Sequence, residues 1–177
     1  MKTEYEIRFL EINTNKVLKK LKEVGATEIG NWVQIRKTYD LVTPKQNSWI
    51  RLRTNGKITT LTVKEINTAR IDGTKEAEVV VDNFDEMDLI LTKIGLKERN
   101  YQENRRHQFK FKDTEIDIDT WPLIPTYLEI EGESESKIKE VCKVLGLDYE
   151  KATTMDVTDI YNKIYGIDIL KIKTLKL

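Results

Sequence analysis

Pairs of like charges recur two residues apart along this sequence, and their types could hold a charged ligand. Side chains two positions apart on a β-strand share one face and lie roughly 6.5–7 Å apart. The residues between the paired charges are mostly apolar, so each strand is expected to have one apolar face and one charged face. The pairs are Glu4/Glu6, Arg51/Arg53, Glu76/Glu78, Asp117/Asp119 and Glu129/Glu131.

Two interpretations of this charged face are open. An antiparallel sheet often exposes a charged face to water, and that interpretation suffices for any one pair. A solvated face usually mixes the two signs, however, because like charges on neighbouring positions repel. Grouped carboxylates are typical of a divalent cation site, and grouped arginines of a phosphate site, since a guanidinium binds phosphate oxygens bidentately. Taken together, the pairs favour a site for a metal-bound polyphosphate.

Alternating apolar residues indicate the strands that must position these charges, and helical segments interrupt them. Asn55 and Gly56 are a typical two-residue hairpin turn between two of the strands. Strands are predicted over residues 3–10, 29–42, 48–55, 58–65, 75–82, 97–112, 114–120 and 126–132. Helices are predicted over residues 14–24, 83–94, 134–145 and 156–165, and a glycine follows each of them.

The order of these elements repeats once along the chain. Strand, helix, glycine and hairpin strands occur in the first half, and strand, helix, Gly95 and further strands in the second. The residue-level similarity is too weak for a solenoid. It is compatible with two related halves that close one sheet on itself. We therefore expect an α+β protein, mostly antiparallel, with three or four helices packed on the sheet.

Composition excludes several classes of protein. The chain has 177 residues, and its 30 basic and 30 acidic side chains cancel, which disfavours a protein that coats nucleic-acid duplexes. A single cysteine, Cys142, and a single histidine, His107, exclude an intrachain disulfide, a multi-thiolate zinc site and two-histidine metal motifs. No apolar run approaches the ~20 residues that cross a bilayer, and no signal peptide is visible. We expect one cytoplasmic domain, residues 1–177, with no membrane partner.

Short motifs along nearly the whole chain resemble those of the CYTH superfamily, which includes class IV adenylyl cyclases, thiamine triphosphatases and inorganic triphosphatases. Glu4–Arg8 resembles its N-terminal E-x-E-x-K signature, which alone would be weak evidence. The order of all the motifs makes the resemblance specific. The other matching segments are Trp49–Arg53 (L-R-L-R), Leu61–Lys64 (L-T-x-K), Lys75–Glu78 (R-x-E-x-E), Asp117–Asp119 with Tyr127–Glu131 (D…F-x-E-I-E) and Asp159–Tyr161 (the last helix).

The resemblance implies an antiparallel β-barrel of about eight strands, with helices packed outside and a polar tunnel for a triphosphate inside. It implies Mg²⁺ or Mn²⁺ as cofactor, and Glu6 and Lys64 as catalytic residues. The carboxylates it places on the metal side are Glu4, Glu6, Glu78, Asp119, Glu129 and Glu131. The cations it places on the phosphate chain are Arg8, Arg51, Arg53, Lys64 and Arg106.

The sequence departs from the family pattern at three places. Arg8 stands where lysine is usual, and an arginine does not accept a proton near neutral pH. Asn104 begins a segment where many relatives carry K-x-R, so one cation is missing or displaced to Arg105. Pro125 occupies a turn where many members have glycine, which should reshape the turn without changing the chemistry.

The sequence leaves the reaction open. A cyclase would direct the 3′-hydroxyl of ATP at the α-phosphorus, whereas a triphosphatase would direct water at the terminal phosphorus of a nucleoside, thiamine or inorganic triphosphate. A non-catalytic module that binds polyphosphate or a nucleotide is the alternative, and Arg8 and Asn104 keep it open. A homodimer is compatible with either. The aromatic residues that could stack on a base or thiazolium, although packing is their commoner role, are Trp32, Tyr39, Trp49 and Trp121.

Overall fold

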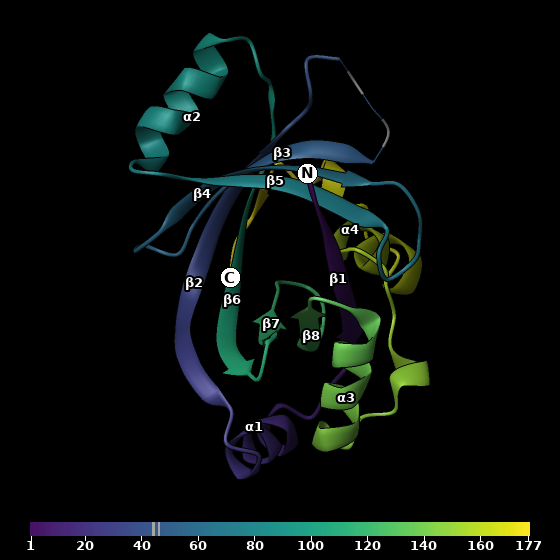
Figure 1. Ribbon diagram of the computed structural model, residues 1–177. Coiled ribbons are helices and arrows are strands. Elements are labelled where there is room, and N and C mark those ends of the chain that lie inside the picture. The colour runs from purple at the N-terminus through teal and green to yellow at the C-terminus, as the bar shows by residue number, and fades with distance from the viewer. Residues whose placement is uncertain (44, 46) are drawn as a thin grey trace.

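A computed structural model describes residues 1–43, 45 and 47–177, and its centre is a closed antiparallel β-barrel (Figure 1). The ring order is β2-β3-β4-β5-β1-β8-β7-β6, and β6 pairs with β2 to close it. The fold class expected from the sequence is therefore confirmed. The strands are β1 (Lys2–Phe9), β2 (Thr27–Tyr39), β3 (Ser48–Thr54), β4 (Thr59–Ile66), β5 (Thr74–Val81), β6 (Glu98–Phe111), β7 (Thr114–Thr120), β8 (Tyr127–Gly132) and β9 (Thr174–Leu175), which pairs in parallel with β6.

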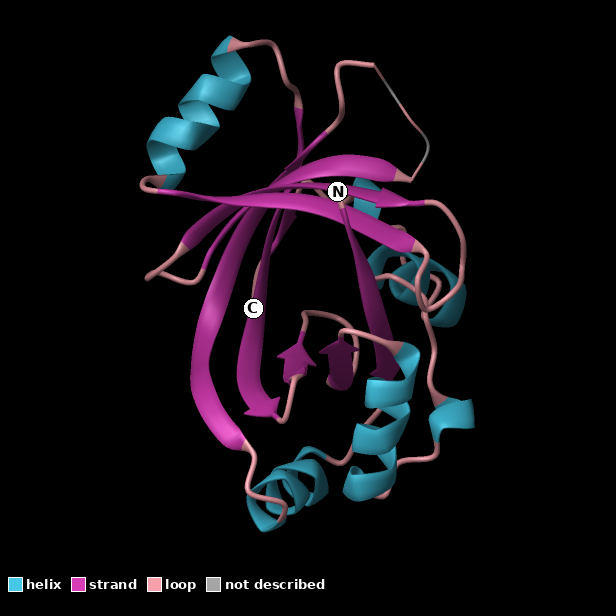
Figure 2. Cartoon of the chain, viewed as in Figure 1, coloured by secondary structure: helices cyan, strands magenta, loops and turns pink. Residues whose placement is uncertain are grey.

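Helices lie outside this ring of strands (Figure 2). They are α1 (Thr14–Glu23), α2 (Phe84–Lys93), α3 (Glu135–Leu145) and α4 (Val157–Asp159), which continues as the π-helix η2 (Ile160–Ile164), with short 3₁₀ turns η1 (Tyr149–Lys151) and η3 (Ile169–Lys171). Asn13, Asn83 and Ser134 cap the first three helices by accepting a hydrogen bond from a backbone N–H of the first turn. Gly146 ends α3 at a φ of +70°, which favours glycine.

The two halves of the chain have the same arrangement of elements. β1, α1, β2, β3 and β4 in the first half correspond to β5, α2, β6, β7 and β8 in the second. Exchanging each strand for its counterpart leaves the ring order unchanged, so β1 pairs with β5 and β2 with β6. The repeat expected from the sequence is thus present in the topology.

The apolar core lies between the outer face of the barrel and the helices. Leu21 of α1 and Ile138 of α3 are fully buried against Ile130 of β8 and its neighbours on β1 and β7. Cys142 of α3 is buried in this cluster, as expected for a core residue. Coverage is incomplete elsewhere, since Val79 on β5 is 59% exposed. No helix in the described part of the chain is long and apolar enough to span a membrane.

The hairpin between β3 and β4 differs from the two-residue turn that the sequence suggested. Residues 55–58 form the loop, and the N–H of Asn55 donates to the carbonyl of Ile58 at 3.2 Å. The side-chain Oδ1 of Asn55 accepts hydrogen bonds from the N–H of Lys57 (3.0 Å) and of Ile58 (2.9 Å). This side-chain turn takes the place of the tighter backbone turn.

Truncation of Ile130 should destabilise the fold, because its side chain is fully buried beneath α3. We expect Ile130→Ala to lower the free energy of unfolding by about 2–5 kcal/mol, measured by urea denaturation. The control is Val79→Ala on the exposed outer face of β5, which should stay within about 0.5 kcal/mol of the parent. Similar losses in both variants would contradict this placement of the core.

Candidate functional site

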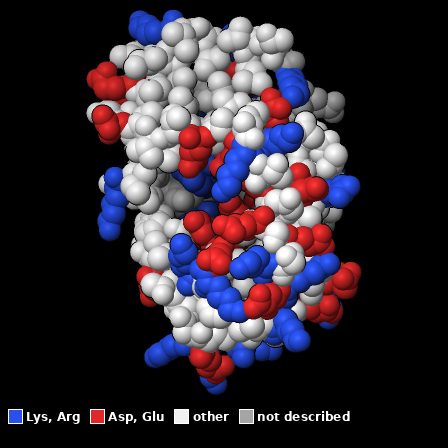
Figure 3. All heavy atoms as spheres, viewed as in Figure 1, with Lys and Arg blue, Asp and Glu red and all other residues white. Residues whose placement is uncertain are grey.

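The barrel encloses a cavity of about 480 Å³ that is lined largely by charged and polar side chains. In Figure 3, acidic and basic side chains gather around a hollow in the middle of the viewed face. The residues that the sequence assigned to metal, phosphate or catalysis all line this cavity, and their individual roles remain predictions. They are Glu4, Glu6, Arg8, Arg51, Arg53, Lys64, Glu78, Arg106, Asp119, Glu129 and Glu131.

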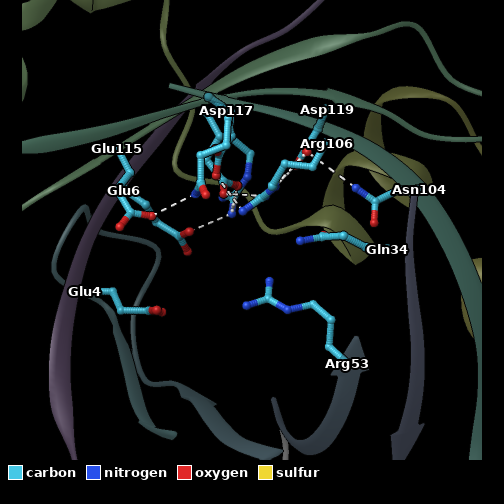
Figure 4. Close-up of polar contacts among 12 residues, drawn as sticks. Glu4, Glu6, Gln34, Arg53, Asn104, Arg106, Glu115, Asp117 and Asp119 are labelled. Atoms are coloured by element: carbon cyan, nitrogen blue, oxygen red, sulfur yellow. Dashed lines mark hydrogen bonds and ion pairs between the residues drawn. The ribbon is translucent and has the colours of Figure 1, made fainter. Parts of the chain in front are cut away.

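One side of the cavity carries three carboxylates in a row across neighbouring strands, Glu6 on β1, Glu131 on β8 and Glu115 on β7. Glu131 lies directly opposite Glu6 in one strand pairing and directly opposite Glu115 in the other. We call these three residues the acid row. Figure 4 shows Glu4, Glu6 and Glu115 on the same side of the cavity. Like charges placed directly across two strands are destabilising, so this arrangement favours a bound cation.

Glu131 is the carboxylate of this row with the least compensation. Among the described residues, no lysine or arginine forms an ion pair with it. Burial, followed by the charges of Glu4 and Glu129, raises the pKa of Glu131 to about 8. The ligand-free cavity therefore holds a carboxyl group that favours a proton or a cation.

Arg8 lies beside the acid row and is only 4% exposed. Its Nη2 is 2.7 Å from Glu6 Oε2 and 2.6 Å from Glu129 Oε2, and its Nη1 donates to the carbonyl of Met155 at 2.8 Å. Burial opposes ionisation of Glu129, but the charges of Arg8 and Arg106 outweigh it and hold the pKa of Glu129 below its usual range. In the ligand-free state, Arg8 neutralises carboxylates rather than facing an open phosphate position.

Two further predicted phosphate ligands are also paired with acids. Lys64 Nζ lies 2.8 Å from Glu4 Oε2, and Arg106 lies within 2.5 Å of both Asp117 and Asp119. Burial alone would lower the pKa of Lys64, but the nearby carboxylates, Glu6 first among them, outweigh burial and raise the pKa above its usual value. Lys64 is therefore a cation near neutral pH, and it is unsuited to accept a proton in this state.

The opposite side of the cavity carries Arg36 on β2 and Arg51 and Arg53 on β3, which we call the arginine wall. Arg36 lies directly opposite Arg53 in the β2–β3 pairing. The Nη2 atoms of Arg51 and Arg53 lie 3.4 Å and 3.7 Å from Glu78 Oε2, so their ion pairs with this carboxylate are long. Burial and the charge of Arg51 lower the pKa of Arg53 to about 10. Figure 4 shows Arg53 extending into the cavity across from the acidic side.

Sequence reasoning missed Arg36 and Glu115. Both were detectable by spacing, because Arg36 shares a strand face with Gln34 and Thr38, and Glu115 shares one with Asp117 and Asp119. Arg36 forms no like-charge pair along its own strand, so it did not stand out in the sequence, whereas Glu115 extends the Asp117/Asp119 pair by one position and was overlooked.

The structure decides between the alternatives that the sequence left open for two residues. Arg105 does not replace a missing cation, because it alternates with the inward-facing Asn104 and Arg106 and is exposed on the outer face of β6. Tyr39 is not available to stack on a ligand, because it is fully buried with Leu52 in the core beneath α2. Trp32, Trp49 and Trp121 do line the cavity.

The donor set fits a hard divalent cation. In residues 1–43, 45 and 47–177, no three carboxylate, cysteine or histidine side chains form a preformed metal cage. Mg²⁺ does not require one, since it is usually held by one or two carboxylates together with phosphate oxygens and water. Glu6 and Glu131 offer such carboxylates on adjacent strands.

Removal of the Glu131 charge should stabilise the metal-free protein at high pH. The pKa of Glu131 in the folded protein is about 8, above the ordinary 4.5. The contribution of this carboxyl group to folding stability is therefore fully present below pH 4.5 and is lost as the pH rises through 8. Glu131→Gln should therefore raise the free energy of unfolding at about pH 9 by on the order of 1 kcal/mol or more, with a smaller effect at about pH 5. Thermal unfolding in EDTA measures this, with the exposed Glu133→Gln as control. A destabilised Glu131→Gln at high pH would contradict the electrostatic account.

Comparison with known proteins agrees with this architecture. The CYTH domain family profile matches residues 2–160. No curated protein matches the chain. The solved structures show similarity of fold. A conserved hypothetical protein from Pyrococcus furiosus is 22% identical with a TM-score of 0.74, covering 88% of this chain and 98% of its own.

Two further solved structures carry names that mention an activity. A candidate adenylate cyclase from Vibrio parahaemolyticus has a TM-score of 0.74 at 15% identity, covering 91% of this chain and 98% of its own. The candidate adenylyl cyclase HpAC1 from Hippeastrum, described as having a dominant triphosphatase activity, has a TM-score of 0.63 at 13% identity, covering 93% and 96%. Because the family profile spans nearly the whole sequence, this chain belongs to the CYTH domain family.

Proposed function

We propose that this protein is a metal-dependent enzyme that acts on the triphosphate group of a small molecule, either cyclising ATP or hydrolysing a nucleoside, thiamine or inorganic triphosphate. The observation that carries the proposal is the opposition of the acid row and the arginine wall in one cavity. A linear triphosphate with a divalent cation is complementary to both sides, because its oxygens suit guanidinium groups and its cation suits carboxylates.

The chemistry of such a reaction needs little covalent participation by the protein. Positioning and charge neutralisation carry most of the rate of phosphorus transfer. Glu6 and Glu131 would hold Mg²⁺ or Mn²⁺, while Arg51 and Arg53 would bind the phosphate chain. A bound divalent cation supplies charge neutralisation and an acidified water or hydroxyl group. Lys64, which remains charged, would act as a phosphate ligand rather than as a base.

Hydrolysis is the first reaction to assay. The name of the Hippeastrum structure mentions a dominant triphosphatase activity, although that protein was a candidate cyclase. A base or thiazolium has aromatic neighbours available in Trp32 and Trp49, which line the cavity. Trp121 is already packed against Arg36 and Tyr161. A non-catalytic binding module would use the same arginine wall but would release no product.

Turnover should depend on a divalent cation and on the acid row. The protein would be incubated with ATP, thiamine triphosphate or inorganic triphosphate and Mg²⁺ or Mn²⁺, with cyclic nucleotide and phosphate release scored together. We expect product from at least one substrate, and its loss with EDTA or in Glu6→Gln. Binding without product from any of these substrates would support the binding-module alternative, and turnover unaffected by EDTA would contradict the metal assignment.

Affinity for triphosphate should depend on the arginine wall. Arg51→Ala should cost about 1.5–3 kcal/mol of tripolyphosphate binding, the range for hydrogen bonds to charged groups, and less for monophosphate. Isothermal titration calorimetry measures both ligands. The exposed Arg70→Ala serves as control, because its guanidinium forms an ion pair with Asp72 at the surface. Equal losses for tripolyphosphate and monophosphate in Arg51→Ala would assign that arginine a purely structural role.

A further inference from the structure

We propose that Arg36 binds the anion together with Arg51 and Arg53, contacting a phosphate group that lies in the cavity over β2 and β3. Gln34, Asn104 and Trp121 position the Arg36 side chain. This inference rests on the proposed function in one respect only, namely that the ligand is a linear triphosphate.

The first observation is the burial of a guanidinium without a counter-charge. Arg36 is 7% exposed, and among the described residues no carboxylate forms an ion pair with it. Its Nε has no hydrogen-bond partner, and the Nε of Arg51 has none either. A buried charge is costly unless it is paired and its donors are satisfied. Two orphaned donors on neighbouring strands therefore point to an anion that completes the arginine wall.

The second observation is that the neighbours fix the position of Arg36 without neutralising it. Its Nη2 donates to Gln34 Oε1 at 2.9 Å and to the Oδ1 of Asn104. The amide of Asn104 is itself oriented, since its Nδ2 donates to Asp119 Oδ1 at 3.4 Å. Trp121 lies beneath the guanidinium, with 4.5 Å between Arg36 Cζ and the ring centroid. Amide and aromatic partners hold the side chain in place but leave its full positive charge available.

The third observation is electrostatic. Arg36 lies directly opposite Arg53 across the β2–β3 pairing, and such like-charge pairs are destabilising in the absence of a ligand. Burial and the charges of Arg51 and Arg53 lower the pKa of Arg36 well below its usual range, against a smaller opposing effect of Asp119. An oxyanion bound in the cavity over the two strands would relieve this repulsion and accept hydrogen bonds from the Nε–H groups of Arg36 and Arg51.

The position of Arg36 also accounts for the cation that is missing at Asn104, where many relatives carry lysine. Gln34 and Asn104 are paired across β2 and β6, and Arg36 reaches Asn104 from the same face of β2. Arg36 thus brings a cation to the side of residue 104, where this sequence has an uncharged amide. The exposed Arg105 points away from the cavity and does not do so.

The test measures binding of inorganic tripolyphosphate in EDTA by isothermal titration calorimetry, so it does not depend on turnover. Arg36→Gln should raise the Kd about tenfold or more, as expected for the loss of a hydrogen bond from a charged group. Arg105→Gln, the matched control on the outer face, should leave it unchanged. Adding Asn104→Lys to Arg36→Gln should restore most of the affinity, because an ammonium group returns beside the vacated position.

A Kd for Arg36→Gln within about twofold of the parent would overturn the inference. A double variant as weak as Arg36→Gln would overturn the placement of the anion beside Asn104. A measurement on the unmodified protein tests the inference even if the Arg36→Gln variant does not fold. The Nε–H NMR resonance of Arg36, assigned by its absence in Arg36→Lys, should shift when tripolyphosphate is added. No shift at saturation would also overturn the inference. A protein without enzymatic turnover but with these binding effects would refute the proposed activity and leave the role of Arg36 intact.

Discussion

Repulsion between like charges on adjacent strands is the interaction on which the interior of this barrel depends. Glu6 faces Glu131 across β1 and β8, and Arg36 faces Arg53 across β2 and β3. Two unit charges ~5 Å apart repel by about 3 kcal/mol at the effective dielectric constant of a partly buried site. The ligand-free protein reduces this cost by ion pairs such as those of Arg8 and by the raised pKa of Glu131. A metal-bound polyanion would remove both repulsions at once.

The fold tolerates this charged interior because its hydrophobic core lies between the outer face of the barrel and the helices. Helices α1 and α3 pack on the outer faces of β1, β7 and β8, where residues such as Ile130 are fully buried. Small barrels usually fill their interior with side chains that form the core. Here, the outward-facing apolar residues stabilise the strands, and the strands in turn hold the charges in register. The corresponding halves of the chain contribute differently, since β3 carries Arg51 and Arg53 where β7 carries Asp117 and Asp119.

The period of two along the strands predicted which residues share the charged face, and the resemblance to the CYTH superfamily supplied the closed barrel that places this face inside. Arg36 escaped this pattern because its partner, Arg53, is on the neighbouring strand, and strand register is not visible in a single sequence. Glu115 is different, because its spacing from Asp117 is visible in the sequence, and only its pairing with Glu131 depends on the folded sheet. The pairing of Arg8 with Glu129 and with the carbonyl of Met155 also depends on long-range contacts. The roles of these residues in binding or catalysis remain predictions.

The most direct test of this account is a crystal structure with tripolyphosphate and Mn²⁺, located by anomalous scattering of the metal. The account predicts a manganese peak within coordination distance of Glu6 and Glu131, and phosphate density between Arg36 and Arg53. A ligand bound outside the barrel, or a metal ion bound away from the acid row, would contradict the central claim. That claim is that the acid row and the arginine wall are the two halves of one site.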